Sequence, residues 1–151
     1  MARSRSPEGP TADGPEEVTA LWLSHHWPDD YDRCIVVGGR HVCRRCLVLY
    51  PLAAAVMVVA YVGGWAAGPV GTWLFVALPL PAVVDLCLEQ LAVVAPSSRR
   101  LVAVTVPLAI GLGIGFARYL ESPGDPLFWG VVVGYTAVCL AALVARWRRD
   151  G

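Results

Sequence analysis

The chain has 151 residues, of which 56% are hydrophobic and 16% are charged, and its formal net charge is zero. A soluble domain usually has about 45–50% apolar and about 25% charged residues, so this composition argues against a soluble globular protein. A net charge of zero also argues against a nucleic-acid partner. The five cysteines are an odd number, which argues against a secreted disulfide framework.

The amino-terminal third of the chain is polar and has two parts. Residues 1–19 are rich in proline, glycine, serine and charge, so we expect a disordered tail. Residues 20–46 form a juxtamembrane segment rich in histidine and cysteine. Within this segment, residues 20–27 are expected to lie on the bilayer as a short interfacial helix, and Gly38-Gly39 predicts a tight turn in a polar loop.

Four apolar stretches follow, and each has about the 20 residues needed to cross about 30 Å of hydrocarbon. They predict a transmembrane domain over residues 47–145, with spans at about 47–66, 72–95, 101–119 and 127–145, followed by a basic tail at 146–151. Pro79 and Pro81 predict a kink in the second span. The predicted fold class is all-α: an integral membrane four-helix bundle with a short cytoplasmic Cys/His-rich N-terminal segment.

The arginines predict the orientation. All 12 basic residues are arginines, and placing the N-terminus in the cytoplasm puts every one of them inside except Arg118. Cytoplasmic segments close to span ends carry such an excess. We therefore expect a multi-pass protein of a bacterial inner membrane, surrounded by the lipid bilayer, with both termini in the cytoplasm. The bacterial source is suggested by the arginine-only, alanine- and valine-rich composition.

Two small-residue motifs lie in the third and fourth spans: Gly111-x-x-x-Gly115 and Gly130-x-x-x-Gly134. Such motifs let helix backbones approach closely in a membrane. The alternative interpretation is that apolar spans of this composition are simply rich in glycine.

The second span contains two carboxyl groups, Asp85 and Glu89, which lie four residues apart on the same helix face. Asp85 is near the middle of the predicted span, where an acid costs about 2.5–3.5 kcal/mol. Intramembrane acids are usually functional, so both are candidate catalytic or ion-binding residues. The alternative is that the pair only fastens helices together through polar contacts.

A cluster of possible metal ligands precedes the first span. A Cys-x-x-Cys turn brings two thiolates together, as a tetrahedral zinc site requires. The predicted zinc ligands are His26, Cys34, Cys43 and Cys46, with His25 and His41 as alternates for the histidine. A redox dithiol and unligated thiols stay open as alternatives.

The same cysteines carry a resemblance to a known family. The motif Cys43-x-Arg45-Cys46-x-x-x-Tyr50, followed later by Pro81-x-x-x-Asp85, resembles the domain-of-unknown-function 2085 family of small bacterial and archaeal membrane proteins. The departures from that family's pattern are Cys34 in place of a serine, Val48 and Leu49 in place of Gly-Ile, Leu86 in place of a glycine, and Gln90 offset by one position. The resemblance implies a small polytopic membrane protein and no established activity.

Three functions fit these features. The first is a structural or assembly protein whose zinc site fixes the N-terminal segment to the bundle. The second is a membrane enzyme that acts on a lipid headgroup or an isoprenoid through Asp85 and Glu89, and the third is a proton- or ion-coupled carrier. The sequence favours the first because no complete catalytic constellation can be written from it, although whether the protein is an enzyme stays open.

The acids and the metal site are both expected near the cytoplasmic end of the bundle. We hypothesise one polar cavity between them, with arginines available to pair with the acids: Arg44, Arg45, Arg99 or Arg100. The expected partners are a second copy of the chain or another membrane protein.

Overall fold

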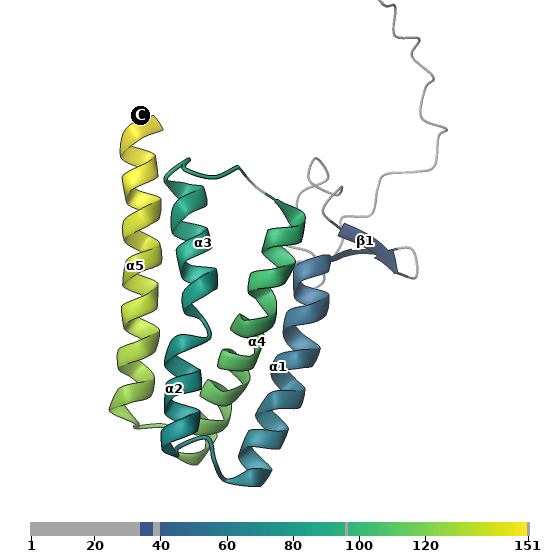
Figure 1. Ribbon diagram of the computed structural model, residues 1–151, viewed down its shortest axis with the longest axis vertical. Coiled ribbons are helices and arrows are strands. Elements are labelled where there is room, and N and C mark those ends of the chain that lie inside the picture. Colours follow the sequence, from purple (N-terminus) through teal and green to yellow (C-terminus); the bar gives the residue numbers. More distant parts are fainter. Residues whose placement is uncertain (1–33, 38–39, 96, 151) are drawn as a thin grey trace, which may run out of the picture.

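The computed structural model describes residues 34–37, 40–95 and 97–150. The tail expected over residues 1–19 and the interfacial helix expected over 20–27 lie outside these ranges. In the described part, a β-hairpin leads into a set of long helices (Figure 1). The elements are β1 (Cys34–Val37), β2 (Arg40–Cys43), α1 (Arg44–Gly63), α2 (Pro69–Ala77), α3 (Leu80–Gln90), α4 (Ser98–Glu121) and α5 (Pro126–Asp150).

The described chain has four helical stretches that are long and apolar enough to cross a membrane. They cover Arg44–Gly63, Pro69–Gln90, Arg99–Glu121 and Pro126–Arg149. Their number and order are as predicted, but their ends differ. The first span ends earlier because Gly64 adopts the left-handed backbone conformation, with φ 64°, that closes a helix. The second begins earlier because Pro69 occupies the first turn of α2, where a missing N–H costs nothing.

The second span is broken, as its prolines predicted. α2 ends at Ala77 and α3 begins at Leu80. Pro79 and Pro81 have no N–H group, so two backbone carbonyls in the preceding turn lose their helical partners. The Tyr135 hydroxyl of α5 donates a hydrogen bond to the Val76 carbonyl at this break. A neighbouring helix therefore provides a donor for one backbone carbonyl at the break.

The described chain is mostly helical, as predicted, but it also contains a β-hairpin that the all-α prediction lacked. β1 and β2 pair antiparallel, with Cys34 opposite Cys43 and Val37 opposite Arg40. The segments on both sides of Gly38-Gly39 contain β-branched residues, which favour strands. We had instead predicted a polar loop there. The tight turn expected at Gly38-Gly39 lies outside the described residues, although the strands that flank it pair directly.

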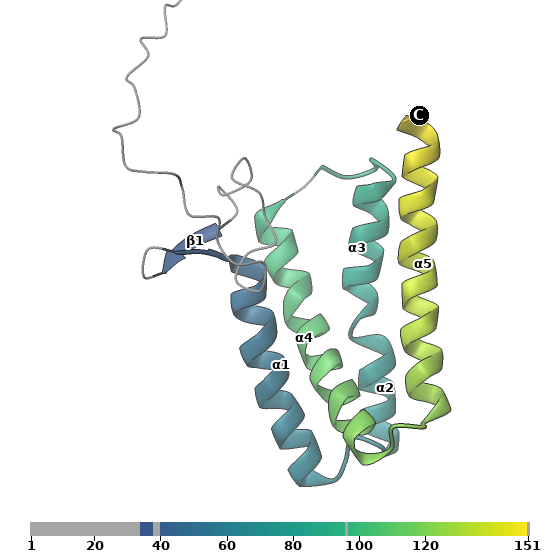
Figure 2. The ribbon, with the colours of Figure 1, turned by 180° about the vertical axis from the view of Figure 1, so that it is seen from behind.

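α4 is the central helix of the described bundle. α1 packs along it on one side, while α2 and α3 pack on it from the other side and α3 also contacts α5 (Figures 1 and 2). In the most apolar part of α4, 39% of the residues are buried, against 6% in α1 and in α5. The outer helices thus expose apolar side chains, which is the pattern expected where the surroundings are hydrocarbon.

Glycines let α4 approach its neighbours closely. A Cβ atom on Gly111 would lie 2.9 Å from Pro79 of the broken span, and one on Gly113 would lie 2.6 Å from the Ala53 carbonyl oxygen of α1. The close approach expected for the first glycine motif is therefore present. Nothing in the described chain lies within 4 Å of a Cβ atom placed on Gly130 or Gly134, so the second motif makes no close contact within the bundle.

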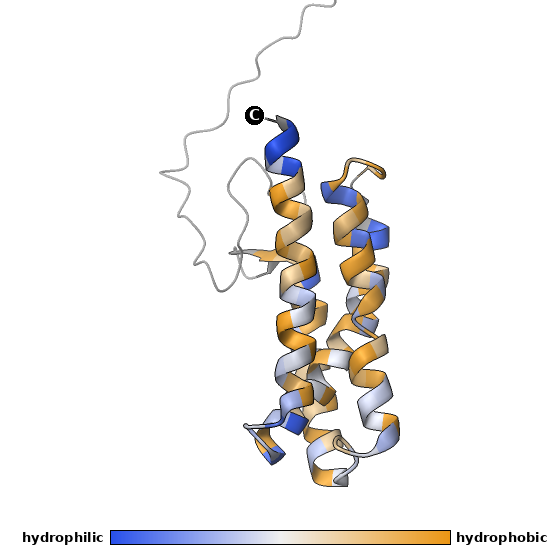
Figure 3. Ribbon diagram, turned by 90° about the vertical axis from the view of Figure 1, so that its left-hand side faces the viewer, coloured by the Kyte–Doolittle hydropathy of each residue, from blue (hydrophilic) through white to orange (hydrophobic). Residues whose placement is uncertain are grey.

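Polar residues mark the two ends of the bundle. The starts of α1 and α4 and the ends of α3 and α5 lie together, and Figure 3 shows hydrophilic residues at this end above apolar helix middles. We call it the arginine-rich end, after Arg44, Arg45, Arg99, Arg100, Arg146, Arg148 and Arg149. The opposite end carries Arg118.

The opposite end is closed by an ion pair and an aromatic cluster. Arg118 of α4 pairs with Asp125 and donates a hydrogen bond of 2.7 Å to the Thr72 hydroxyl of α2. Asp125 also accepts a hydrogen bond from the Leu127 amide at the start of α5, as an N-cap residue does. The Phe75 ring of α2 stacks on Phe128 of α5, with centroids 5.9 Å apart. These contacts join α2, α4 and α5.

Candidate functional sites at the arginine-rich end

Three of the four predicted zinc ligands come together at the base of the hairpin. The strand register places Cys34 opposite Cys43, and α1 begins at the next residue, so Cys46 follows within its first turn. The Cys43 and Cys46 thiols share a hydrogen bond, and Cys34 lies close enough to interact with Cys46 electrostatically. Cys34 and Cys43 are buried, with 7% and 3% of their surface exposed. Within the described residues, none of the three is joined in a disulfide.

The histidines of the predicted zinc site are not placed beside these thiols. His25 and His26 lie outside the described residues, and for His41 the structure describes only the backbone, which pairs with Val36 in the hairpin. Among the described residues, no group of three or more histidine, cysteine, aspartate or glutamate side chains is arranged to hold a metal ion. The described chain thus gathers the thiols but does not contain a formed metal shell.

A positively charged side chain also lies near these thiols. Arg45 interacts electrostatically with Cys46. Zinc binds cysteines as deprotonated thiols.

Asp85 forms an ion pair with Arg100, one of the four arginines expected to be available to it. Arg100 lies in the first turn of α4, and Asp85 is buried, with 8% of its surface exposed. The second span ends at Gln90, so Asp85 is five residues, or about 7.5 Å, from that end. Asp85 therefore lies in the last third of the helical stretch Pro69–Gln90, and not near its middle as predicted, because the predicted span ended five residues later.

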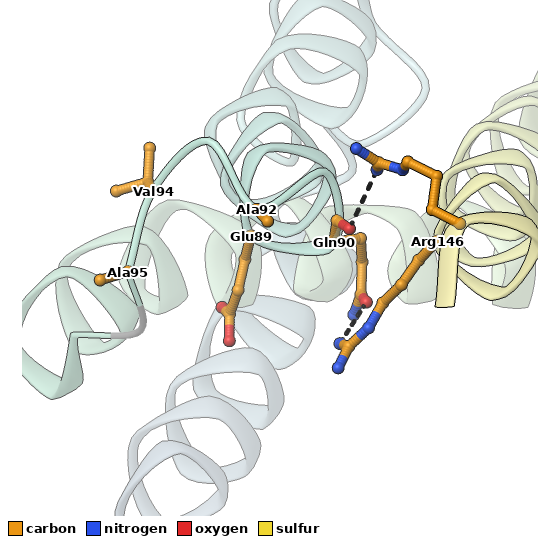
Figure 4. Close-up of a pocket in the computed structure, with 7 residues that line it drawn as sticks. Glu89, Gln90, Ala92, Val94, Ala95 and Arg146 are labelled. Atoms are coloured by element: carbon orange, nitrogen blue, oxygen red, sulfur yellow. Dashed lines mark hydrogen bonds between the residues drawn. The ribbon is translucent and has the colours of Figure 1, made fainter. Parts of the chain in front are cut away.

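Glu89 has different surroundings from Asp85. It lines an open pocket of about 460 Å³ between the end of α3, the following loop and the end of α5. The residues that line the pocket are Glu89, Gln90, Ala92, Val94, Ala95, Arg146 and Arg149 (Figure 4). Asp85 and the hairpin cysteines are not among them, and α1 with the hairpin lies on the other side of α4. We had hypothesised one cavity that joins the acids to the cysteines. This pocket does not join them.

Two arginines from the last turns of α5 hold the end of α3. Arg146 Nη1 donates to the Gln90 side-chain oxygen at 2.9 Å. Arg149 donates to the backbone carbonyls of Leu91 and Gln90 at 3.2 and 3.4 Å. Terminal helix carbonyls lack intrahelical donors and carry partial negative charge, so cations stabilise them.

This pocket was not predicted from the sequence, because residues 146–151 were expected to form a separate basic tail. α5 continues as a helix to Asp150. Arg146 and Arg149 are three residues apart, so they share a helix face. That spacing was the available signal in the sequence.

Comparison with known protein families, curated proteins and solved structures gives no match to this chain. The described residues define a class by themselves: they form four helical stretches that are long and apolar enough to cross a membrane, with a thiol cluster and a charged pocket at one end. The resemblance to the domain-of-unknown-function 2085 family stays a prediction from its motifs.

Proposed function

We propose that this chain is a multi-pass protein of the bacterial inner membrane with a structural or assembly role, in which a zinc site at the hairpin fixes the N-terminal segment to the bundle. Cys34, Cys43 and Cys46 supply three thiolates, and a histidine supplies the fourth ligand. His26 is preferred for this position, with His25 and His41 as alternates. The motif that resembles the domain-of-unknown-function 2085 family lies at this same place.

The observation that carries the proposal is the convergence of three cysteines that are spread over 13 positions of the sequence, from 34 to 46. The hairpin has two strands of four residues each. A two-stranded hairpin of this size is marginally stable alone in water, and small structures of this kind commonly depend on a metal. A zinc ion at its base would hold the hairpin against the start of α1.

The distribution of arginines supports cytoplasmic termini. The arginine-rich end contains the start of α1, the end of α5 and every described arginine apart from Arg118. Such a strong bias between the two ends matches the positive-inside rule. The thiols would then face a reducing compartment, where zinc binding is favoured over a permanent disulfide.

The surroundings of Asp85 support a structural role over a catalytic one. Its carboxylate is bound by Arg100 of α4, so the pair joins two helices. An ion pair of this kind is a common way to carry an acid in an apolar span. The assignment leaves Glu89 as the acid that is open to a ligand.

The test is the zinc content of the detergent-purified protein. We expect about one zinc per chain, lost in the Cys43→Ser/Cys46→Ser double variant because two of four ligands are removed. Cys139→Ser is the matched control, since this cysteine lies in α5, away from the hairpin. Absence of metal from the wild-type protein, or full retention in the double variant, would overturn the proposal.

Single alanine variants of His25, His26 and His41 identify the fourth ligand. The variant that loses zinc affinity most strongly marks the histidine that binds. A zinc affinity equal to that of the wild-type protein in all three variants would exclude a histidine from the site.

A further inference from the structure

The proposed zinc site makes no use of the pocket between α3 and α5. We propose that this pocket binds the zwitterionic headgroup of an aminophospholipid, with the lipid phosphate at Arg149 and Arg146 and its ammonium group at Glu89. The proposal is independent of zinc binding, because no hairpin residue lines the pocket.

The pocket lies at the level of lipid headgroups. The second span, Pro69–Gln90, has 22 residues, or about 33 Å of helix, so Gln90 comes at the edge of about 30 Å of hydrocarbon. The fourth span has 24 residues, or about 36 Å. The last turns of α5, with Arg146 and Arg149, therefore extend past the hydrocarbon boundary beside the end of α3.

Arg149 is held in place and still has donors to offer. Its hydrogen bonds to the carbonyls of Ala145, Leu91 and Gln90 fix the guanidinium at the pocket wall. Arginine has five N–H donors, so these three bonds leave two for a ligand. A planar guanidinium with two free donors suits the oxygens of a phosphate group.

The charges of the pocket fit a zwitterion better than a simple anion. Two guanidinium groups and one carboxylate line it. Figure 4 shows the Arg146 guanidinium at the end of the Gln90 side chain, and the Glu89 side chain apart from both. A carboxylate at an anion site weakens the binding of a phosphate by repulsion, whereas it attracts an ammonium group. The volume of about 460 Å³ is within the usual range of about 300–1,000 Å³ for ligand sites.

The experiment is lipid titration of the delipidated protein in detergent, read by native mass spectrometry. The probes are phosphatidylethanolamine, phosphatidylcholine and phosphatidylglycerol with identical acyl chains. We expect phosphatidylethanolamine to bind about tenfold more tightly than the other two, because only its primary ammonium combines a positive charge with hydrogen-bond donors for Glu89. Equal affinity for the three lipids would overturn the proposal.

Variants separate the two halves of the headgroup. Glu89→Gln should abolish the preference for phosphatidylethanolamine over phosphatidylcholine, while Arg149→Gln should weaken all three lipids. Arg148→Gln is the matched control. Arg148 has the same charge, lies exposed at the position of α5 just before Arg149, and does not line the pocket. Loss of binding in the control equal to that in Arg149→Gln would show nonspecific charge attraction and overturn the site.

Two further measurements protect the interpretation. Thermal unfolding without added lipid checks that each variant is folded, and Glu89→Gln alone still tests the ammonium half if Arg149→Gln is unstable. Inorganic phosphate and free phosphoethanolamine, added at millimolar concentration, test whether the ligand is soluble. Displacement of the lipid by either one at an equal concentration would assign the pocket to a soluble phosphate and overturn the lipid proposal.

Discussion

The ion pair between Asp85 and Arg100 gives the most informative test of the bundle, because its two ends are buried to different extents. The side chain of Asp85 is 9% exposed and that of Arg100 is 29% exposed. We predict that Arg100→Gln destabilises the protein more than Asp85→Asn does, although each variant removes the same contact.

The magnitudes follow from what each variant leaves behind. Arg100→Gln leaves the Asp85 carboxylate without its partner, about 7.5 Å from the end of the span. Breaking a buried pair costs about 3–5 kcal/mol, and this position close to the boundary puts the expected cost at the lower limit, about 3 kcal/mol. Asp85→Asn leaves a long, partly exposed arginine whose charged group can extend to the headgroups, so we expect about 1–2 kcal/mol.

The assay is reversible unfolding of the purified protein in mixed micelles, with the two single variants and the double variant measured together. The double variant should be more stable than the sum of the single effects implies, by about 1–2 kcal/mol, because it leaves no unpaired charge. Equal single effects that simply add would refute the reasoning and show that the two side chains do not interact.

Two other predictions concern α4 and the opposite end. Gly113→Ala should cost about 1–3 kcal/mol of stability through overpacking, because the new methyl group meets the Ala53 carbonyl of α1. Gly134→Ala, whose methyl group meets nothing within 4 Å, should be neutral or stabilising in the same unfolding assay. Equal losses of stability in the two variants would contradict this packing. The hydrogen bond from Arg118 lowers the pKa of Asp125, so the folded state binds this proton more weakly than the unfolded state. Stability from this pair should be full above about pH 4 and lost as pH falls further; the stability advantage over Asp125→Asn should therefore shrink in acid, and a pH-independent difference would argue against the pair.

The sequence predicted the number of spans, their order and the break in the second span, because hydrocarbon thickness and proline chemistry act through local sequence. The ends of the spans were less predictable. Residues 91–95 are apolar and continued the predicted second span, yet α3 ends at Gln90 and Ala92 adopts a left-handed conformation with φ 55°. Hydropathy cannot detect such an end, because the residues that follow it are equally apolar.

The partners of charged side chains could be predicted only as sets. Four arginines were available to Asp85, and the choice of Arg100 depends on α4 packing directly against α3. The separation of Glu89 from Asp85 depends on α5, whose last turns lie over the end of α3. The hairpin was missed because its strands have four residues each, too short for alternation to stand out beside apolar spans.

The hydrogen bond from Tyr135 to the Val76 carbonyl has a consequence for how the protein is assembled. Spans enter a membrane in chain order, so the second is in place before the fourth exists. Until α5 arrives, the backbone at the break lacks the hydroxyl that it meets in the finished bundle. This contact between the second and fourth spans therefore forms late in biogenesis, and a nascent chain that stops before Tyr135 lacks it.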